Sequence, residues 1–285
     1  AATSHVSTRD RTLRRWMPMR STVSRFVVNE MNRLDHRCSS GRPTRFCRMS
    51  AAAVTTERRD GVLVVHLDDG KANALSFDMI AAINESLDEA ERDDEIRAVV
   101  LHGRPGKFSA GFDLGVMFGD DMSAIINLVA DGGALVHRLY GSSVPVVAAS
   151  TGHALAAGAL VLLGCDVRVA GDVEAKVGLN EVAIKMVLPD WALTIATDRL
   201  SKRHLQRALA NARVTTPREA VDVGFVDEVV ADGDELDRAV AVAAELASTL
   251  DPSAYARTVR AIRGPVLDLM AEQIASDRSS GASPV

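Results

Sequence analysis

The sequence is poor in aromatic residues and cysteine, and it has no long apolar run. Phe, Trp and Tyr make up only 4% of the 285 residues, so Ala, Val, Leu and Ile must build the core. The longest apolar candidate, residues 144–163, is interrupted by proline, glycine and polar residues, so we expect no membrane span of roughly 20 apolar residues. Cys38 and Cys47 lie near the N-terminus and Cys165 lies in an apolar run, which predicts a buried Cys165 and no disulfide framework.

Motifs that mark metal and nucleotide sites are also missing. The seven histidines are scattered, and none is paired with Cys, Asp or Glu at ligand spacing, so we expect no metal site. Neither G-x-x-x-x-G-K-[ST] nor a G-x-G-x-x-G after a strand is present. G-x-S-x-G is absent as well, although composition alone leaves a Ser/His/Asp triad open.

Charge is distributed unevenly along the chain. Residues 1–48 hold eleven Arg, no Lys and three acids, a net charge of +8. Since the whole chain is at −5, the remainder carries −13. An acidic body argues against electrostatic binding of nucleic acid, and we expect no nucleic-acid partner.

The basic segment 1–48 has three interpretations: a targeting presequence, a basic arm for nucleic acid, or a disordered extension or upstream sequence before a start at Met49. The last is favoured, because MSAAAVTTERRDGVLVVHLDD reads like the beginning of a domain. We therefore expect a core domain over 50–250 and a C-terminal helical region over 251–285. The expected location is cytoplasmic, or the mitochondrial matrix if 1–48 is a presequence.

Apolar periodicity predicts alternating strands and helices from residue 61 onward. β-branched runs indicate strands over 61–69, 97–103, 145–151 and 167–171, with an extended piece over 224–230. Helical periods cover 77–94, capped by Ser76, and then 123–141, 158–166, 189–200, 201–212, 217–223, 234–249 and 251–277. This alternation predicts an α/β fold with mostly parallel strands and helices outside.

Two loops of small residues leave predicted strands: FSAGFD (108–113) and TGHALAAGA (151–159). Small side chains let the backbone approach a ligand, and a loop that runs into a helix leaves its first N–H groups free. Two such amides aimed at one point would stabilise a developing oxyanion. On spacing alone, tight packing of helices on the sheet is the favoured interpretation.

A single carboxylate, Glu181, lies in the apolar run VGLNEVAIKMVLPDW (177–191). Asn180 and Lys185 are the only other polar groups of that run before Pro189. An acid buried in such surroundings has a raised pKa and is suited to act as a base. The alternative from the residues alone is a surface acid at a helix start, with Asn180 as the cap.

Several segments resemble the crotonase (enoyl-CoA hydratase/isomerase) superfamily in order and spacing. They are RPGKFSAGFDL, PVVAASTGHALAAGALVLLGCDVRVAG, KVGLNEVAIKMVLP and EAVDVGFVDEVV, with KANALS (71–76) upstream. The resemblance covers about residues 54–275. Within the superfamily, VGLNE followed by LPDW, together with AAGALV, is similar to the mitochondrial-type Δ3,Δ2-enoyl-CoA isomerases.

The resemblance implies a crotonase (ClpP-like) spiral of β-β-α units, whose C-terminal helical region builds homotrimers that often pair into hexamers. It implies acyl-CoA substrates and no cofactor, since the thioester's own acidity drives the chemistry. By residue matching, the oxyanion amides are those of Phe112 and Ala157, and Glu181 is the base. The residues implied to line the CoA and acyl path are Lys71, Ala72, Asn73, Leu75, Ala110, Gly111, Asp113, Leu114, Gly115, Leu160 and Trp191.

Hydratases of this family use two glutamates, and the first of those positions is Leu160 here. Hydration divides its work between two carboxylates, whereas moving a double bond needs one base and an oxyanion hole. We therefore expect Glu181 to isomerise 3-enoyl-CoA to trans-2-enoyl-CoA in fatty-acid metabolism. The alternatives are an enoyl-CoA hydratase, forming 3-hydroxyacyl-CoA, and a non-catalytic acyl-CoA binding protein.

Other polar residues have plainer interpretations. Asp113 is expected to cap the following helix, and His153 to be a packed or solvent-facing loop residue. Asp190 becomes a candidate second acid only if its loop folds inward. Asp227 and Glu228 are expected at a solvated edge.

Overall fold

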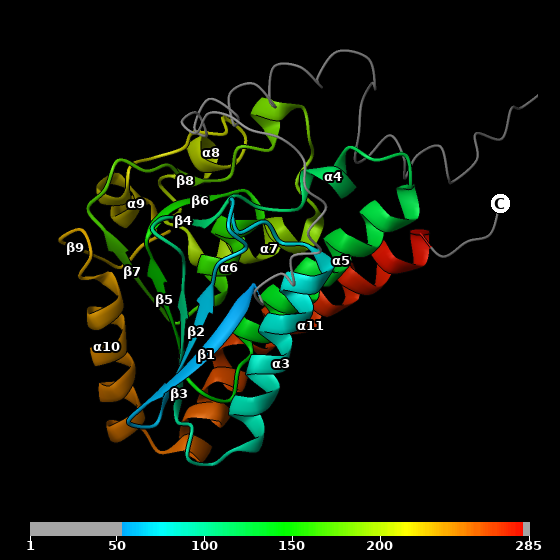
Figure 1. Ribbon diagram of the computed structural model, residues 1–285. Coiled ribbons are helices and arrows are strands. Elements are labelled where there is room, and N and C mark those ends of the chain that lie inside the picture. The colour runs from blue at the N-terminus through cyan, green and yellow to red at the C-terminus, as the bar shows by residue number, and fades with distance from the viewer. Residues whose placement is uncertain (1–52, 282–285) are drawn as a thin grey trace, which may run out of the picture.

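The computed structural model describes residues 53–281, in which a mostly parallel six-stranded sheet forms the centre (Figure 1). Its strand order is β1-β2-β3-β5-β7-β9. The strands are β1 (Val54–Arg59), β2 (Val62–Leu67), β3 (Ala98–His102), β5 (Val146–Ser150), β7 (Val167–Gly171) and β9 (Glu228–Val230). β1 is antiparallel to β2, and all other neighbours are parallel, as the pattern predicts.

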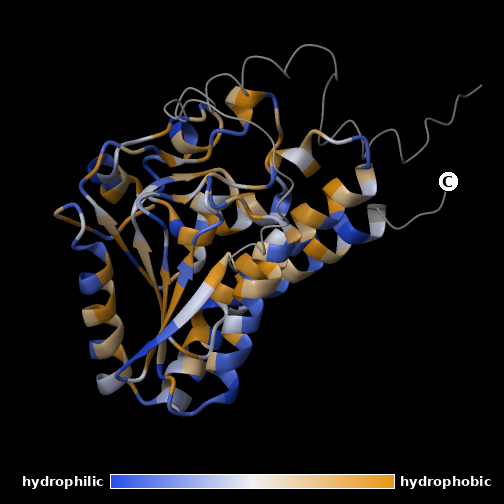
Figure 2. Ribbon diagram, viewed as in Figure 1, coloured by the Kyte–Doolittle hydropathy of each residue, from blue (hydrophilic) through white to orange (hydrophobic). Residues whose placement is uncertain are grey.

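Helices cover both faces of this sheet. α3 (Phe77–Arg92) and α5 (Met122–Tyr140) lie on one side, and α10 (Glu235–Thr249) lies on the other. Alternate side chains of each strand point to opposite faces. Val64 and Val100 thus pack towards Ala239 of α10, while their neighbours face the larger core. Figure 2 shows the apolar side of α10 turned towards the sheet. Burial on both faces explains why these strands read as continuous apolar runs.

A second sheet, which the sequence analysis missed, has three parallel strands in the order β4-β6-β8. They are β4 (Gly106–Ser109), β6 (Gly152–Leu155) and β8 (Val177–Gly178). The first two were assigned to loops, because they are four residues long and rich in small side chains. Their pairing depends on glycine: a Cβ on Gly152 would lie 2.0 Å from the backbone of Gly106.

The remaining elements are short helices between these sheets and the C-terminal helix. They are α4 (Leu114–Met117), α6 (Ala157–Gly164), the 3₁₀ helix η1 (Val182–Ile184), α7 (Asp190–Arg199), α8 (Leu205–Ala208), α9 (Pro217–Val223) and α11 (Pro252–Gly281). The predicted helices are confirmed except for 201–212, where only the single turn of α8 forms. β9 covers only the end of the extended piece predicted over 224–230, and the exposed, polar strand β1 was not predicted.

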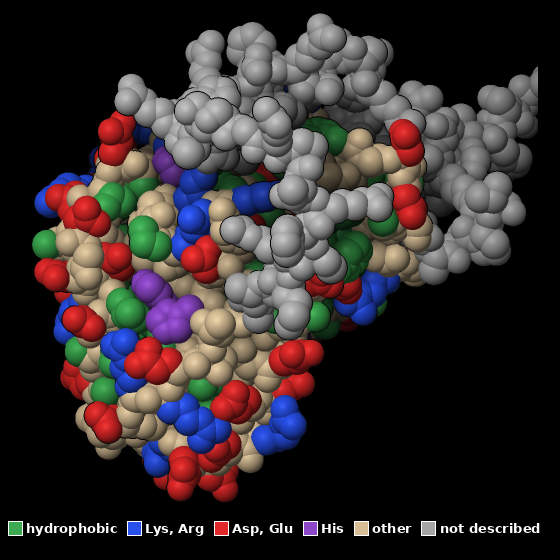
Figure 3. All heavy atoms as spheres, in the orientation of Figure 1, with side chains coloured by type: hydrophobic (Ala, Val, Ile, Leu, Met, Phe, Trp, Pro, Cys, Tyr) green, Lys and Arg blue, Asp and Glu red, His purple; other side chains and the backbone are tan. Residues whose placement is uncertain are grey.

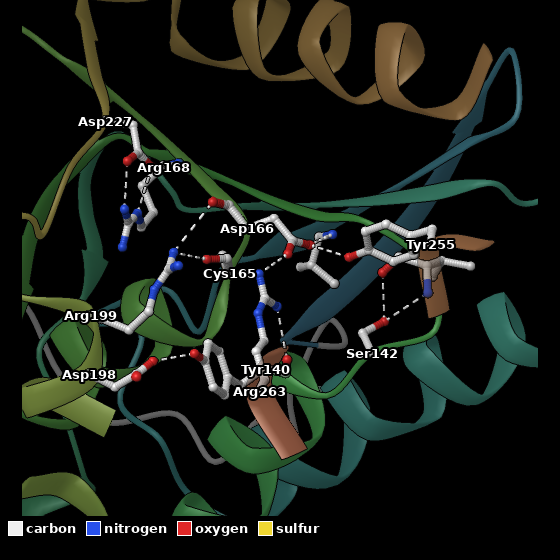
Figure 4. Close-up of polar contacts among 12 residues, drawn as sticks. Tyr140, Ser142, Cys165, Asp166, Arg168, Asp198, Arg199, Asp227, Tyr255 and Arg263 are labelled. Atoms are coloured by element: carbon white, nitrogen blue, oxygen red, sulfur yellow. Dashed lines mark hydrogen bonds and ion pairs between the residues drawn. The ribbon is translucent and has the colours of Figure 1, made fainter. Parts of the chain in front are cut away.

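The helix α11 packs against α5 and α7 and is fastened to the core by Asp166 (Figure 4). Its Arg263 and Tyr255 donate to the Asp166 carboxylate at 2.7 and 2.9 Å, and the amide of Val146 donates at 2.7 Å. The side chains of Arg263 and Asp166 are each only 12% exposed. Breaking such a buried pair leaves an uncompensated charge, so this contact holds α11 in place.

Asp227 lies at a solvated edge, as predicted, and its side chain is 41% exposed. Its carboxylate accepts two hydrogen bonds, at 2.7 and 2.6 Å, from the guanidinium of Arg168, whose residue is 4% exposed (Figure 4). A buried guanidinium requires such a partner. Glu228 bonds the exposed Arg238, as a surface acid would. Cys165 is buried as predicted, and burial raises the pKa of its thiol to about 12.

The predicted extension over 1–48 lies outside the described residues. Among those described, no helix is long and apolar enough to cross a membrane. On the face in Figure 3, basic and acidic side chains are interspersed. Among the ion pairs of the described residues, Arg58 pairs with Glu89 and with Asp93.

Candidate active site

The carboxyl ends of the small sheet bring together the three groups singled out in the sequence. Phe112 follows the end of β4, Ala157 follows the end of β6, and Glu181 follows the end of β8. Because these strands are parallel and adjacent, their carboxyl ends lie at one edge. The sheet therefore gathers residues that are 69 positions apart in the chain.

The amide of Phe112 is directed away from the strand-like segment beside it. Leu75 donates to the carbonyl of Gly111 at 2.8 Å and accepts from the amide of Asp113 at 3.2 Å. In this parallel bridge the N–H of Phe112 itself points to the opposite side. It donates no hydrogen bond to any group in the described part of the chain.

The amide of Ala157 is the first of helix α6 and likewise has no acceptor among the described residues. Ala156 before it has φ 51° and ψ −127°, a conformation that costs a non-glycine residue on the order of 1–3 kcal/mol. Its amide donates to Gly178 at 3.0 Å, which holds the turn against β8. The turn thus presents Ala157 N–H in a fixed direction.

The two amides are brought close by glycines. A Cβ on Gly111 would lie 3.3 Å from the nitrogen of Ala157, and one on Gly158 would lie 2.4 Å from the carbonyl oxygen of Ser109. Gly111 also has φ +96°, which favours glycine. The small residues of the two loops therefore serve both roles that the sequence analysis treated as alternatives: they allow tight packing, and they accompany a pair of free amides.

Glu181 is buried rather than a surface acid. The residue is 8% exposed, and its Oε2 has no hydrogen-bond partner among the described groups. Burial raises the pKa of this carboxyl to about 7, against an ordinary 4.5. Asn180 does not cap the short helix η1 through its side chain, and its Oδ1 is also buried without a described partner.

Apolar side chains surround this edge. Leu160, one turn into α6, is 1% exposed, and Trp191 at the start of α7 is fully buried. Both belong to the same core cluster as Ala157. The indole Nε1 of Trp191 is buried and has no described partner.

The segment KANAL (71–75) supports the loop that carries Phe112. The side-chain amide of Asn73 donates to Leu67, Lys107 and Phe108 carbonyls at 2.7–3.2 Å, and its oxygen accepts from Asp69. Ala72 accepts from the amide of Ala110 at 3.0 Å. Asn73 and Leu75 are buried, whereas Lys71 is exposed. The side chain of Asn73 is thus occupied in holding the loop.

The remaining predicted residues take ordinary positions. Asp113 caps α4 by accepting from the amide of Gly115 at 2.7 Å, as one interpretation predicted, and Leu114 follows it as the first helical residue. His153 Nδ1 accepts from the amide of Lys176. Asp190 is the first residue of α7.

Sequence reasoning missed Ser109. Its hydroxyl donates to the carbonyl of Asn73 at 2.7 Å and accepts from the amide of Gly111 at 3.2 Å, joining KANAL to the amide loop. Nothing in the sequence distinguished this serine from others beside glycine.

Two free amides beside a buried carboxyl of pKa about 7 suit proton transfer next to a carbonyl whose oxygen gains charge. The described residues contain no group of three or more potential metal ligands. A family model described as Enoyl-CoA hydratase/isomerase matches residues 57–280.

The chain belongs to this family. It is 34% identical over 212 residues to mouse mitochondrial enoyl-CoA delta isomerase 1, covering 74% of this chain and 73% of that protein. It is 35% identical over 205 residues to a putative enoyl-CoA hydratase of Thermus thermophilus, covering 67% and 77%. The crystal structure of human mitochondrial delta3-delta2-enoyl-CoA isomerase matches with a TM-score of 0.76 at 30% identity, covering 80% and 90%.

The predicted superfamily and fold are thereby confirmed: the protein is a crotonase-superfamily enzyme of the enoyl-CoA isomerase/hydratase type, from fatty-acid metabolism. Its named relatives include both isomerases and hydratases.

A hollow of about 410 Å³ lies elsewhere, at the amino ends of β3 and β5, and none of the predicted site residues lines it.

Proposed function

We propose that this enzyme isomerises 3-enoyl-CoA to trans-2-enoyl-CoA with Glu181 as its only proton-transferring carboxylate. The observation that carries the proposal is a buried carboxyl, whose Oε2 has no described partner, at the same edge of the small sheet as two free amides. Glu181 removes a proton from C2, and the C3–C4 double bond becomes part of a dienolate. The same carboxyl returns the proton to C4, so the double bond lies between C2 and C3 and no atom is gained or lost.

The amides of Phe112 and Ala157 stabilise the thioester oxygen while it carries the dienolate charge. Removing one donor of such a pair typically costs about 10²–10³-fold in kcat. Helix α6 adds the positive end of its dipole at Ala157. KANAL, the 110–115 loop, Leu160 and Trp191 form the CoA and acyl path in this proposal.

Leu160 favours isomerisation over hydration. An apolar side chain that is 1% exposed holds no water and supplies no second acid. An enoyl-CoA hydratase is the second candidate, favoured by the relatives that carry that name. A non-catalytic acyl-CoA binding protein is the third.

Glu181→Gln separates a catalyst from a binder. Wild type and variant are offered trans-3-hexenoyl-CoA, and conjugated-thioester absorbance is followed. Hexanoyl-CoA binding is measured by calorimetry. We expect similar affinities and a loss in kcat of about 10²–10⁴-fold. A wild type that binds hexanoyl-CoA without turning over hexenoyl-CoA would support the binding protein.

We also propose that the chain assembles as a homotrimer or hexamer. Ile262 and Leu269, two turns apart on α11, are 68% and 45% exposed, and Leu193 of the adjoining α7 is 37% exposed. Apolar side chains grouped on one surface are typical of an interface. Sedimentation analysis of wild type and Ile262→Asp tests this.

For location, we propose the cytoplasm, with the mitochondrial matrix as the alternative.

A further inference from the structure

Two consecutive glycines, Gly132 and Gly133, lie inside helix α5, where glycine is disfavoured relative to alanine. The space that their missing side chains leave is occupied by aromatic rings. A Cβ on Gly132 would lie 2.3 Å from Cε1 and 2.5 Å from Cζ of Phe112. A Cβ on Gly133 would lie 2.8 Å from Cε2 of Trp191. Both rings therefore rest on the helix backbone.

The Phe112 ring is thus held at its far edge by α5, while its backbone is held by Leu75. Leu75 fixes the flanking peptide groups through bonds of 2.8 and 3.2 Å. The α5 backbone is the less movable partner, since the helix has 19 residues and packs against α3, α6 and α11. A side chain added at Gly132 would therefore displace the ring and turn the residue that carries the free amide.

We propose that Gly132 is a positioning residue for the oxyanion hole. Its missing side chain leaves room for the Phe112 ring against α5, and the position of that ring sets the direction of the Phe112 N–H. This inference rests on the proposed isomerase function. Gly132 touches no substrate and acts through Phe112 alone. The side chain at position 112 therefore matters for how it locks the amide, although the chemistry uses only the backbone.

A double-mutant cycle tests whether Gly132 acts through the Phe112 ring. In wild type, Gly132→Ala should lower kcat for trans-3-hexenoyl-CoA about 10²-fold, as loss of one oxyanion donor does, and change KM less than about threefold. In a Phe112→Ala background, where no ring meets the added methyl group, Gly132→Ala should lower kcat less than about twofold. Such coupling marks two residues that act as a unit.

The matched control is Gly264→Ala in α11. The nearest atom to a Cβ there is Arg260 Cζ at 3.8 Å, an ordinary contact, so kcat should not change. Should Gly132→Ala not fold, Phe112→Tyr carries the test, because its hydroxyl is attached at the Cζ that faces α5. It should lower kcat at least about tenfold relative to Phe112→Leu, with KM changed little.

Equal losses of kcat from Gly132→Ala in both backgrounds, or equal kcat for the Phe112→Tyr and Phe112→Leu variants, would overturn the positioning role of Gly132. Neither result would contradict the proposed isomerase function. A wild type that does not convert trans-3-hexenoyl-CoA would overturn the proposed function and this inference with it.

Discussion

The amide of Ala156 donates a 3.0 Å hydrogen bond to the carbonyl of Gly178. This bond joins the turn that presents the Ala157 amide to the strand that leads to Glu181. The proposed acid and one oxyanion donor are therefore placed by adjacent strands, β6 and β8, of one sheet. Their relative position is fixed before any substrate binds, which is the preorganisation that electrostatic catalysis requires.

The rate of isomerisation should depend on the charge of Glu181. Only the carboxylate form can remove a proton from C2, and burial raises the pKa of this group to about 7. We expect kcat/KM for trans-3-hexenoyl-CoA to rise with pH and level off above about 7, since this profile reports the free enzyme's base. An inflection near the ordinary value of 4.5 would show that Glu181 is solvated or is not the base.

The same burial should make the wild type less stable as pH rises. Between 4.5 and about 7 the folded state binds more protons at Glu181 than the unfolded state does, so the free energy of unfolding falls. The whole difference is on the order of 3 kcal/mol. Glu181→Gln should therefore gain stability relative to wild type from pH 5 to pH 8 in urea unfolding. A constant difference between the two proteins would contradict the burial of a charge.

Placing an acid at position 160 should introduce some hydratase activity. Leu160→Glu places a second carboxyl one turn from Ala157, where it can orient a water and supply a proton. We expect crotonyl-CoA hydration to rise at least about tenfold over wild type. Leu160→Gln, similar in size and polarity but without an acid, is the control. Equal rates for the two variants would show that the missing carboxyl does not limit hydration.

The buried pair that fastens α11 should contribute strongly to stability. Asp166→Asn leaves the guanidinium of Arg263 buried without a charge partner, which typically costs about 3–5 kcal/mol. The control is Asp268→Asn, which breaks the pair with Arg260, whose side chains are 64% and 62% exposed, and should cost under about 1 kcal/mol. Denaturant unfolding compares them. Similar losses would mean that the Asp166 pair is no better shielded than a surface pair.

The main sheet and most helices could be predicted from the sequence, because the strands are continuous apolar runs and the helices are long enough to show a regular apolar period. The residues that cap the helices also lie next to them in the sequence. Ser76 accepts from Met79 at the start of α3, and Thr216 forms a capping box with Glu219 at α9. The small sheet could not be predicted, because its strands have two to four residues and contain glycines that resemble loops.

The candidate site was reached through resemblance rather than through pattern. Glu181 stood out as a lone acid, but only the structure shows that it is buried. The free amides of Phe112 and Ala157 are backbone groups, and no side chain marks them in a sequence. The pairing of Asp227 with Arg168 could not be predicted, because the two residues are 59 positions apart, beyond the reach of local periodicity.

The most direct measurement offers one preparation of purified protein trans-3-hexenoyl-CoA and, separately, crotonyl-CoA, while the absorbance of the conjugated enoyl thioester is recorded. The one-carboxylate account predicts rapid appearance of this absorbance from the first substrate and little loss of it from the second. Rapid loss from crotonyl-CoA would show that hydration proceeds without an acid at position 160, and it would contradict the account.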